Sequence, residues 1–154
     1  MNNQYLLDFY KIELLSIKQK VTEGKANLAK PVLLLSVFDA IESGQIGGNR
    51  IMYEVIKPIY EAYLREVQTE QTPLKYPFYH MKSDGFWKLE WKSNVPKVPA
   101  TPSDKFLRDN LAYAMFDNAL WDLLQDKAAR DYYREAIIRD CREMPKKFST
   151  FLTN

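Results

Sequence analysis

The chain has 154 residues, of which 46% are apolar and 27% charged, and its formal net charge is +2. This length is typical of one domain, so we expect residues 1–154 to form a single one. The composition excludes a disordered chain, and no apolar run approaches the roughly 20 residues of a membrane helix. The single cysteine, Cys141, excludes a disulfide within the chain and favours a reducing, cytoplasmic location. The net charge is too small to indicate a nucleic-acid partner from the total alone.

The first half of the chain predicts helices. Apolar residues recur at helical spacing over residues 4–22, and Gly24 ends this segment. Pro31 opens a second helix that is apolar on nearly all sides, which is typical of a central, buried helix. The clearest helical periodicity runs over residues 51–67, where Pro58 is expected to kink or split the helix.

The middle of the chain carries the β signal. Residues 78–82 and 86–91 alternate in polarity and flank Ser83-Asp84-Gly85, a sequence typical of a hairpin turn. We therefore expect a β-hairpin at this place. Three prolines within residues 94–103 indicate an extended connector after it.

The last third returns to helical patterns. Ser103 and Asp104 are expected to cap a helix over residues 105–114. Helical turns over 118–124 and an amphipathic helix over 127–142 follow. The expected fold class is α+β and predominantly α-helical, with five to six helices and one β-hairpin. A winged-helix-like arrangement of these elements is compatible with this pattern.

The sequence offers little for catalysis. There is one histidine and one cysteine, whereas zinc sites and multi-histidine nuclease sites need more ligands. Gly47-Gly48 lacks the Lys-Ser/Thr pair of a phosphate-binding loop. The carboxylates are scattered over helix faces, and Cys141 is best interpreted as a small core residue. We therefore expect a binding domain, with no catalytic residue, no metal and no cofactor.

One candidate binding segment precedes the buried helix, at residues 25–31. Lys30 lies at the start of that helix, where backbone N–H groups form an anion site that an added ammonium would make suitable for phosphate. Lys25 and Asn27 lie in the same segment. Two alternatives stay open: Lys30 points to solvent, and Asn27 serves as a turn residue.

A second candidate segment is residues 75–80. Tyr76-Pro77 predicts a rigid, extended apolar ledge, because proline restricts both itself and its predecessor. His80, Lys82 and Lys88 would share the non-core face of the hairpin beside this ledge. The alternative is an ordinary polar face of a sheet.

The motifs resemble a known family, the sulfur-binding domain of phosphorothioate-dependent restriction endonucleases. In that bacterial family the reader domain usually precedes an HNH nuclease domain. The resemblance covers roughly residues 25–142. It rests on Lys30-Pro31-Val32-Leu33-Leu34-Leu35, Asp39-Ala40-Ile41-Glu42, Asn49-Arg50-Ile51, Tyr76-Pro77-Phe78-Tyr79-His80-Met81, Ser83-Asp84-Gly85-Phe86-Trp87 and Leu107-Arg108-Asp109-Asn110-Leu111-Ala112-Tyr113-Ala114.

The resemblance implies a reader of double-stranded DNA in which sulfur replaces a non-bridging phosphate oxygen. It implies a sulfur pocket of Tyr76, Pro77 and His80, with Lys30 on the phosphate backbone. Many members carry His or Tyr where this chain has Ala29, and the position of His80 often holds a smaller or differently polar residue. Weaker candidates for backbone contacts are Asn27, Lys25, Lys82, Lys88, Lys105 and Arg108. A nuclease domain or subunit is the expected partner besides DNA.

Two other functions are compatible with the sequence. A winged-helix-like domain would read ordinary DNA with the hairpin as its wing and the helix after Asn49 as its reading helix, although that helix has few base-reading side chains. A protein-interaction subunit of a defence or regulatory assembly would use the aromatic surface instead. We expect phosphorothioate-DNA reading, probed by comparing modified and unmodified duplexes.

Overall fold

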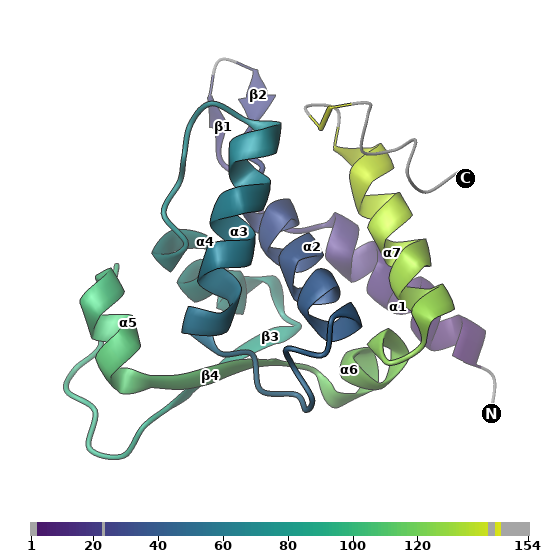
Figure 1. Ribbon diagram of the computed structural model, residues 1–154. Coiled ribbons are helices and arrows are strands. Elements are labelled where there is room, and N and C mark those ends of the chain that lie inside the picture. The colour runs from purple at the N-terminus through teal and green to yellow at the C-terminus, as the bar shows by residue number, and fades with distance from the viewer. Residues whose placement is uncertain (1–2, 23, 142–143, 146–154) are drawn as a thin grey trace.

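The computed structural model describes residues 3–22, 24–141 and 144–145. Within them the chain forms seven α-helices, a 3-10 turn and two two-stranded antiparallel sheets (Figure 1). The fold is therefore α+β and predominantly helical, which confirms the expected class. The elements are α1 (Asn3–Leu15), β1 (Val21–Thr22), β2 (Lys25–Ala26), α2 (Ala29–Glu42), α3 (Tyr53–Val67), α4 (Lys75–His80), η1 (Met81–Asp84), β3 (Trp87–Trp91), α5 (Asp104–Asn110), β4 (Leu111–Phe116), α6 (Asn118–Leu124) and α7 (Lys127–Asp140).

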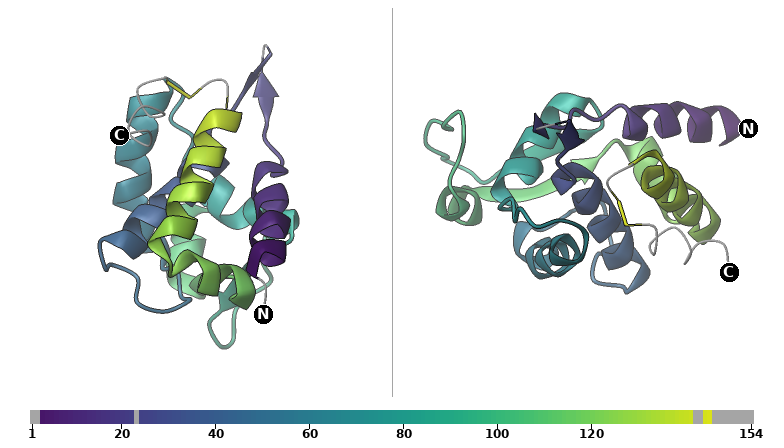
Figure 2. Two further views of the ribbon diagram at one scale, coloured as in Figure 1. Left: turned by 90° about the vertical axis from the view of Figure 1, so that its right-hand side faces the viewer. Right: turned by 90° about the horizontal axis from the view of Figure 1, so that it is seen from above.

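Helix α2 is the centre of the molecule, as its apolar sequence predicts. Residues 32–35 along it are fully buried, and Ser36 satisfies its buried hydroxyl by donating to the Val32 carbonyl at 2.7 Å. Helices α3, α4 and α7 pack around α2, and α1 and α6 pack against α7 (Figure 2). Because α2 is enclosed along its sides, only its two ends can take part in a surface site.

Helix α3 runs unbroken through Pro58, so the predicted split of this helix is wrong. Its apolar face, which includes the buried Ile56, Tyr60 and Leu64, lies against the core on both sides of the proline. Packing of this face holds the helix together where Pro58 removes one backbone hydrogen bond.

The β-hairpin predicted over residues 78–91 does not form. Residues 75–80 are helix α4 and 81–84 a 3-10 turn, which Gly85 ends with a φ of +97°. Strand β3 instead pairs with β4, more than twenty residues later. Phe78 and Tyr79 are both buried although they are neighbours, which a helix allows and a half-buried strand does not. The wing of the winged-helix alternative is therefore missing, and Tyr76-Pro77 lies on a helix rather than on an extended ledge.

Other boundaries differ in a similar way. Helix α1 ends at Leu15, short of the expected residue 22, and α5 ends at Asn110 because β4 follows it. Ser103 does cap α5, since its hydroxyl accepts a hydrogen bond from the Phe106 N–H at 3.0 Å. Helices α6 and α7 lie close to their predicted ranges, and Cys141 is buried in the core as expected.

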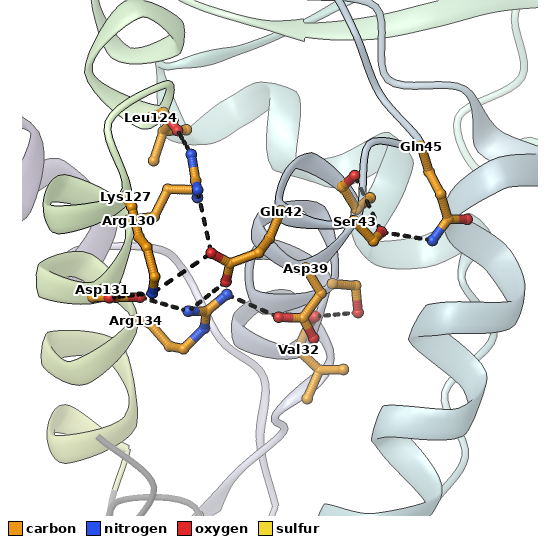
Figure 3. Close-up of polar contacts among 12 residues, drawn as sticks. Val32, Asp39, Glu42, Ser43, Gln45, Leu124, Lys127, Arg130, Asp131 and Arg134 are labelled. Carbon is orange, nitrogen blue, oxygen red and sulfur yellow. Dashed lines mark hydrogen bonds and ion pairs between the residues drawn. The ribbon is translucent and has the colours of Figure 1, made fainter. Parts of the chain in front are cut away.

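The carboxyl end of α2 is tied to α7 by a group of charged side chains, which we call the α2–α7 ion cluster (Figure 3). Arg134 contacts Asp39 at 2.9 Å, and Arg130 contacts Glu42 at 3.3 Å while donating to the Leu124 carbonyl at 2.8 Å. The full cluster is Asp39, Glu42, Lys127, Arg130, Asp131 and Arg134. Among the residues described, no helix is both long and apolar enough to cross a membrane.

Candidate functional site

The amino end of α2 opens into a groove of about 540 Å³, which we call the α2 groove. Four parts of the chain form it: the segment after α1, the start of α2, the loop after α3, and α4. Tertiary packing brings these parts together, since they are far apart in sequence. The lining residues are Lys18, Gln19, Lys20, Asn27, Ala29, Lys30, Glu70, Gln71, Thr72, Pro73, Tyr76, Pro77 and His80. Five candidates thus share one concave surface: Asn27, Lys30, Tyr76, Pro77 and His80.

Asn27 organises the floor of the α2 groove. Its side-chain oxygen accepts a hydrogen bond from the Ala29 N–H at 2.8 Å, and its amide donates to the Thr72 hydroxyl at 2.8 Å. Gln68 accepts from the Leu28 N–H at 2.9 Å beside it. Asn27 therefore joins the start of α2 to the loop after α3, so the interpretation of Asn27 as a turn residue describes its contacts well.

Lys30 does not point freely into solvent. Its ammonium lies 2.6 Å from the Asp84 carboxylate, and the two side chains are only 12% and 2% exposed. The other oxygen of Asp84 accepts a hydrogen bond from the backbone N–H of Lys18 at 2.9 Å. Asp84 thus connects η1, α2 and the segment after α1 at the edge of the groove. Because an ammonium has three N–H donors, Lys30 keeps donors for a ligand while its charge is balanced by Asp84.

Tyr76 and Pro77 supply the apolar part of the α2 groove from α4. Pro77 is buried, whereas Tyr76 keeps 41% of its surface exposed. The ammonium of Lys75 lies 5.1 Å from the centre of the Tyr76 ring, a cation–π contact that orients the ring. An exposed aromatic ring next to a proline forms a surface that suits a weakly hydrated ligand.

His80 lines the same groove with its imidazole packed edge-on to Tyr79, the ring centres 5.0 Å apart. Burial lowers the pKa of His80 below its usual 6.5, and the nearby charges of Lys30 and Lys82 lower it further. The neutral form of His80 is therefore favoured. Ala29, the position where the resembling family often carries a ring, lines the groove as well.

Four of the remaining candidates lie outside the α2 groove. Lys82 sits 4.9 Å from the Tyr79 ring centre and, with Lys88, lines a separate hollow of about 530 Å³ over β3. On α5, Lys105 pairs with Asp109 at 2.6 Å and Arg108 with Asp104 at 2.8 Å, so their charges are largely balanced. The side chain of Lys25 falls outside the described residues.

Sequence reasoning missed two basic residues and one loop of the groove. Lys18 and Lys20 fall within the first helix predicted over residues 4–22, but α1 ends at Leu15 and the segment after it lines the groove. The loop at residues 70–73 carries no binding motif, yet it lines the groove too. No local signal marks these residues, because their place depends on the packing of α1, α2 and α3. In the part of the chain described, no three acidic, histidine or cysteine side chains gather into a possible metal site.

The sequence matches the model of a known protein family. The family described as "ScoMcrA-like, DNA sulfur-binding domain" matches residues 9–140, which is most of the chain. No curated protein matches this sequence at a significant level.

Solved structures of low sequence identity share the fold. The sulfur-binding domain of ScoMcrA complexed with phosphorothioated DNA has a TM-score of 0.71 at 15% identity, covering 94% of this chain and 98% of that one. The corresponding domain of SprMcrA, also with phosphorothioated DNA, has a TM-score of 0.70 at 18% identity, covering 92% and 88%. A longer ScoMcrA chain with sulfur-binding and SRA domains has a TM-score of 0.68 at 17% identity, covering 84% of this chain. The present chain spans 42% of that longer one.

Proposed function

This chain belongs to the ScoMcrA-like family of DNA sulfur-binding domains, and we propose that it reads phosphorothioate-modified double-stranded DNA through the α2 groove. The observation that carries the proposal is the composition of that groove, where Tyr76 and Pro77 line the same cavity as Lys30 and the amino end of α2. An apolar surface and a site for an anion thus adjoin, as recognition of a sulfur-bearing phosphate requires.

The apolar side of the groove favours sulfur over oxygen. Sulfur is larger and less strongly hydrated than the oxygen it replaces, so contact with an apolar wall stabilises it while oxygen loses hydration. Tyr76 is half-exposed in the free domain and has surface left to bury. We infer that the sulfur rests against Tyr76 and Pro77, with His80 completing the pocket.

The polar side of the groove holds the backbone charge. Lys18, Lys20 and Lys30 line it together with one acid, Glu70, and Asp84 lies behind Lys30. The groove therefore carries a small excess of positive charge, and the positive end of the α2 dipole adds to it. This arrangement supports binding of a DNA backbone whose affinity falls with salt.

His80 and Ala29 together suggest how this chain builds its pocket. The domains that it resembles often have a ring at the position of Ala29 and a smaller or differently polar side chain at that of His80. Both positions line one groove, so a neutral imidazole from α4 can fill space that a ring from α2 fills elsewhere. We infer that the pocket keeps its volume by this exchange.

The proposed role is reading without cleavage by the described residues. Any strand scission would come from a nuclease domain or subunit that acts with this module, in bacterial restriction or defence. The proposal concerns this domain alone. The longer related chains contain further parts, and similarity in the sulfur-binding domain does not extend the activities of those parts to this chain.

The test compares two duplexes of identical sequence, one with a single phosphorothioate and one without, at several salt concentrations. We expect the sulfur duplex to bind at least about tenfold more tightly, a difference of about 1.4 kcal/mol, with both affinities falling as salt rises. Equal binding of the two duplexes would contradict the pocket assignment. Binding to neither, together with a stable protein partner, would favour an interaction subunit instead.

A further inference from the structure

The Lys30–Asp84 pair bears on how the α2 groove would distinguish modified from unmodified DNA. A cation at a DNA-binding groove attracts every phosphate, modified or not, so it adds affinity without discrimination. Here the cation is bound to a carboxylate that is only 2% exposed. Burying a carboxylate costs free energy, so a free Lys30 with no acid beside it would be the simpler way to build a phosphate site.

We propose that Asp84 determines selectivity by neutralising Lys30, which weakens binding of ordinary phosphate more than binding of phosphorothioate. This inference deepens the proposed function and rests on it. Specificity is a difference between two affinities, and it rises when an interaction that favours the wrong ligand is removed.

The chemical reason lies in the two acceptors. A charged donor forms its short, strong hydrogen bonds with oxygen, whereas sulfur gains most from apolar contact. An ammonium shared with Asp84 at 2.6 Å has less attraction left for a phosphate oxygen. A phosphorothioate keeps its charge and one non-bridging oxygen, so the proposal requires that sulfur take the place of the oxygen that faces Lys30. The apolar contact of that sulfur with Tyr76 and Pro77 does not depend on the ammonium, so the sulfur ligand then loses less.

The geometry also allows neutralisation of Lys30 by Asp84 to be distinguished from a purely structural role of Asp84. Asp84 uses one oxygen for Lys30 and the other for the backbone N–H of Lys18. An Asp84→Asn variant keeps an oxygen for the Lys18 N–H, yet removes the charge that balances Lys30. The substitution therefore changes the electrostatics of the groove with the smallest change in its shape.

The test measures binding of D84N to the modified and unmodified duplexes over a range of salt. The expected result is a gain: the unmodified duplex binds about fivefold more tightly, the slope of log affinity against log salt steepens by about 0.9, and the preference for sulfur falls. A role limited to anchoring would give the opposite, an equal loss for both duplexes with no steeper slope, and would overturn the proposal.

Two further variants complete the experiment. Glu135→Gln on α7 also removes one negative charge from a cation, Arg139, but outside the α2 groove, so it should leave the sulfur preference unchanged. The double variant Lys30→Gln/Asp84→Asn removes both charges of the pair, so its salt slope should be about 0.9 shallower than that of D84N. Its affinity for unmodified DNA should not exceed that of the wild type, because no unpaired Lys30 is left, and an increase would overturn the proposal even if D84N alone unfolds.

A wild-type domain without sulfur preference would refute the proposed function. The salt slope of D84N on unmodified DNA would still decide whether Asp84 neutralises Lys30, so the two failures are distinguishable.

Discussion

The two ends of α2 hold similar charged side chains in different settings. At the carboxyl end, the α2–α7 ion cluster contains three cations and three acids, joined from two helices. At the amino end, three lysines line the α2 groove against Glu70 and the buried Asp84. One end is balanced and closed, and the other keeps an excess cation and an open cavity. The comparison suggests that the first serves stability and the second serves recognition.

The largest expected effect concerns the closed end. Arg134 is 14% exposed and contacts Asp39 and Asp131 at 2.9 Å each. Arg134→Met therefore removes the ion pair of Asp39, whereas Asp131 keeps Lys127 at 2.9 Å. We expect the free energy of unfolding to fall by about 2 kcal/mol, less than for a fully buried pair because both acids are partly exposed. Denaturant unfolding measures this loss, while the affinity of the folded fraction for DNA should stay unchanged.

A matched control for Arg134 lies on the same helix. Arg139 is 62% exposed and pairs with Glu135, so Arg139→Met should cost less than about 1 kcal/mol. Similar losses for both variants would mean that the ion cluster contributes no more than a surface pair.

The next effect concerns the open end. Tyr76→Ala removes the ring on which the proposed sulfur site depends, and we expect about tenfold weaker binding of the phosphorothioate duplex, or about 1.4 kcal/mol. Binding of the unmodified duplex and the stability of the domain should change much less, since the ring is 41% exposed in the free state. Tyr5→Ala, at a 73% exposed ring outside the groove, is the control. An equal loss for both duplexes would exclude a sulfur-specific role.

The smallest effect is a dependence on pH. The pKa of His80 is lowered by burial and by Lys30 and Lys82, so protonation is disfavoured in the free, folded domain. The phosphate backbone would raise this pKa in the complex, and affinity should therefore rise about threefold as pH falls from about 7.5 to 5.5. Titration of binding at several pH values tests this, and His80→Gln should remove the dependence.

The same group affects stability with the opposite sign. Because its pKa in the folded domain is lower than in the unfolded chain, the contribution of His80 is complete above 6.5 and is lost as pH falls through the lowered value. For DNA binding, a His80→Gln variant that kept the full pH dependence would show that another titrating group causes that dependence.

Local signals in the sequence predicted the elements that local physics decides. The continuous apolar run after Pro31 predicts the buried helix α2, and Ser103 predicts the start of α5. Strand β4 could not be found in this way, since residues 111–116 follow a helix without a break and become a strand through pairing with β3 and with Ile51. The strand predicted from the short alternating run at residues 78–82 is wrong for a similar reason, because five residues fit a helical turn as well as a strand.

The candidate site shows the same division. The resemblance to a family pointed to Lys30, Tyr76, Pro77 and His80, and these residues do line one groove. Their roles in binding stay predictions. Neither the resemblance nor local patterns indicated Lys18, Lys20 or the partner of Lys30, because a buried ion pair between residues 54 positions apart leaves no periodicity in the sequence.

The split origin of the α2 groove has a consequence for how binding measurements are interpreted. Its walls come from four segments, so the groove exists only in molecules whose tertiary packing is complete. Partial unfolding of α1 or of the loop after α3 would remove part of the wall and leave the helical content nearly intact. Apparent affinity then falls in proportion to the competent fraction of molecules, even where no contact with DNA has changed. Under the proposed function, DNA binding would therefore report the folding of this domain more sensitively than circular dichroism does.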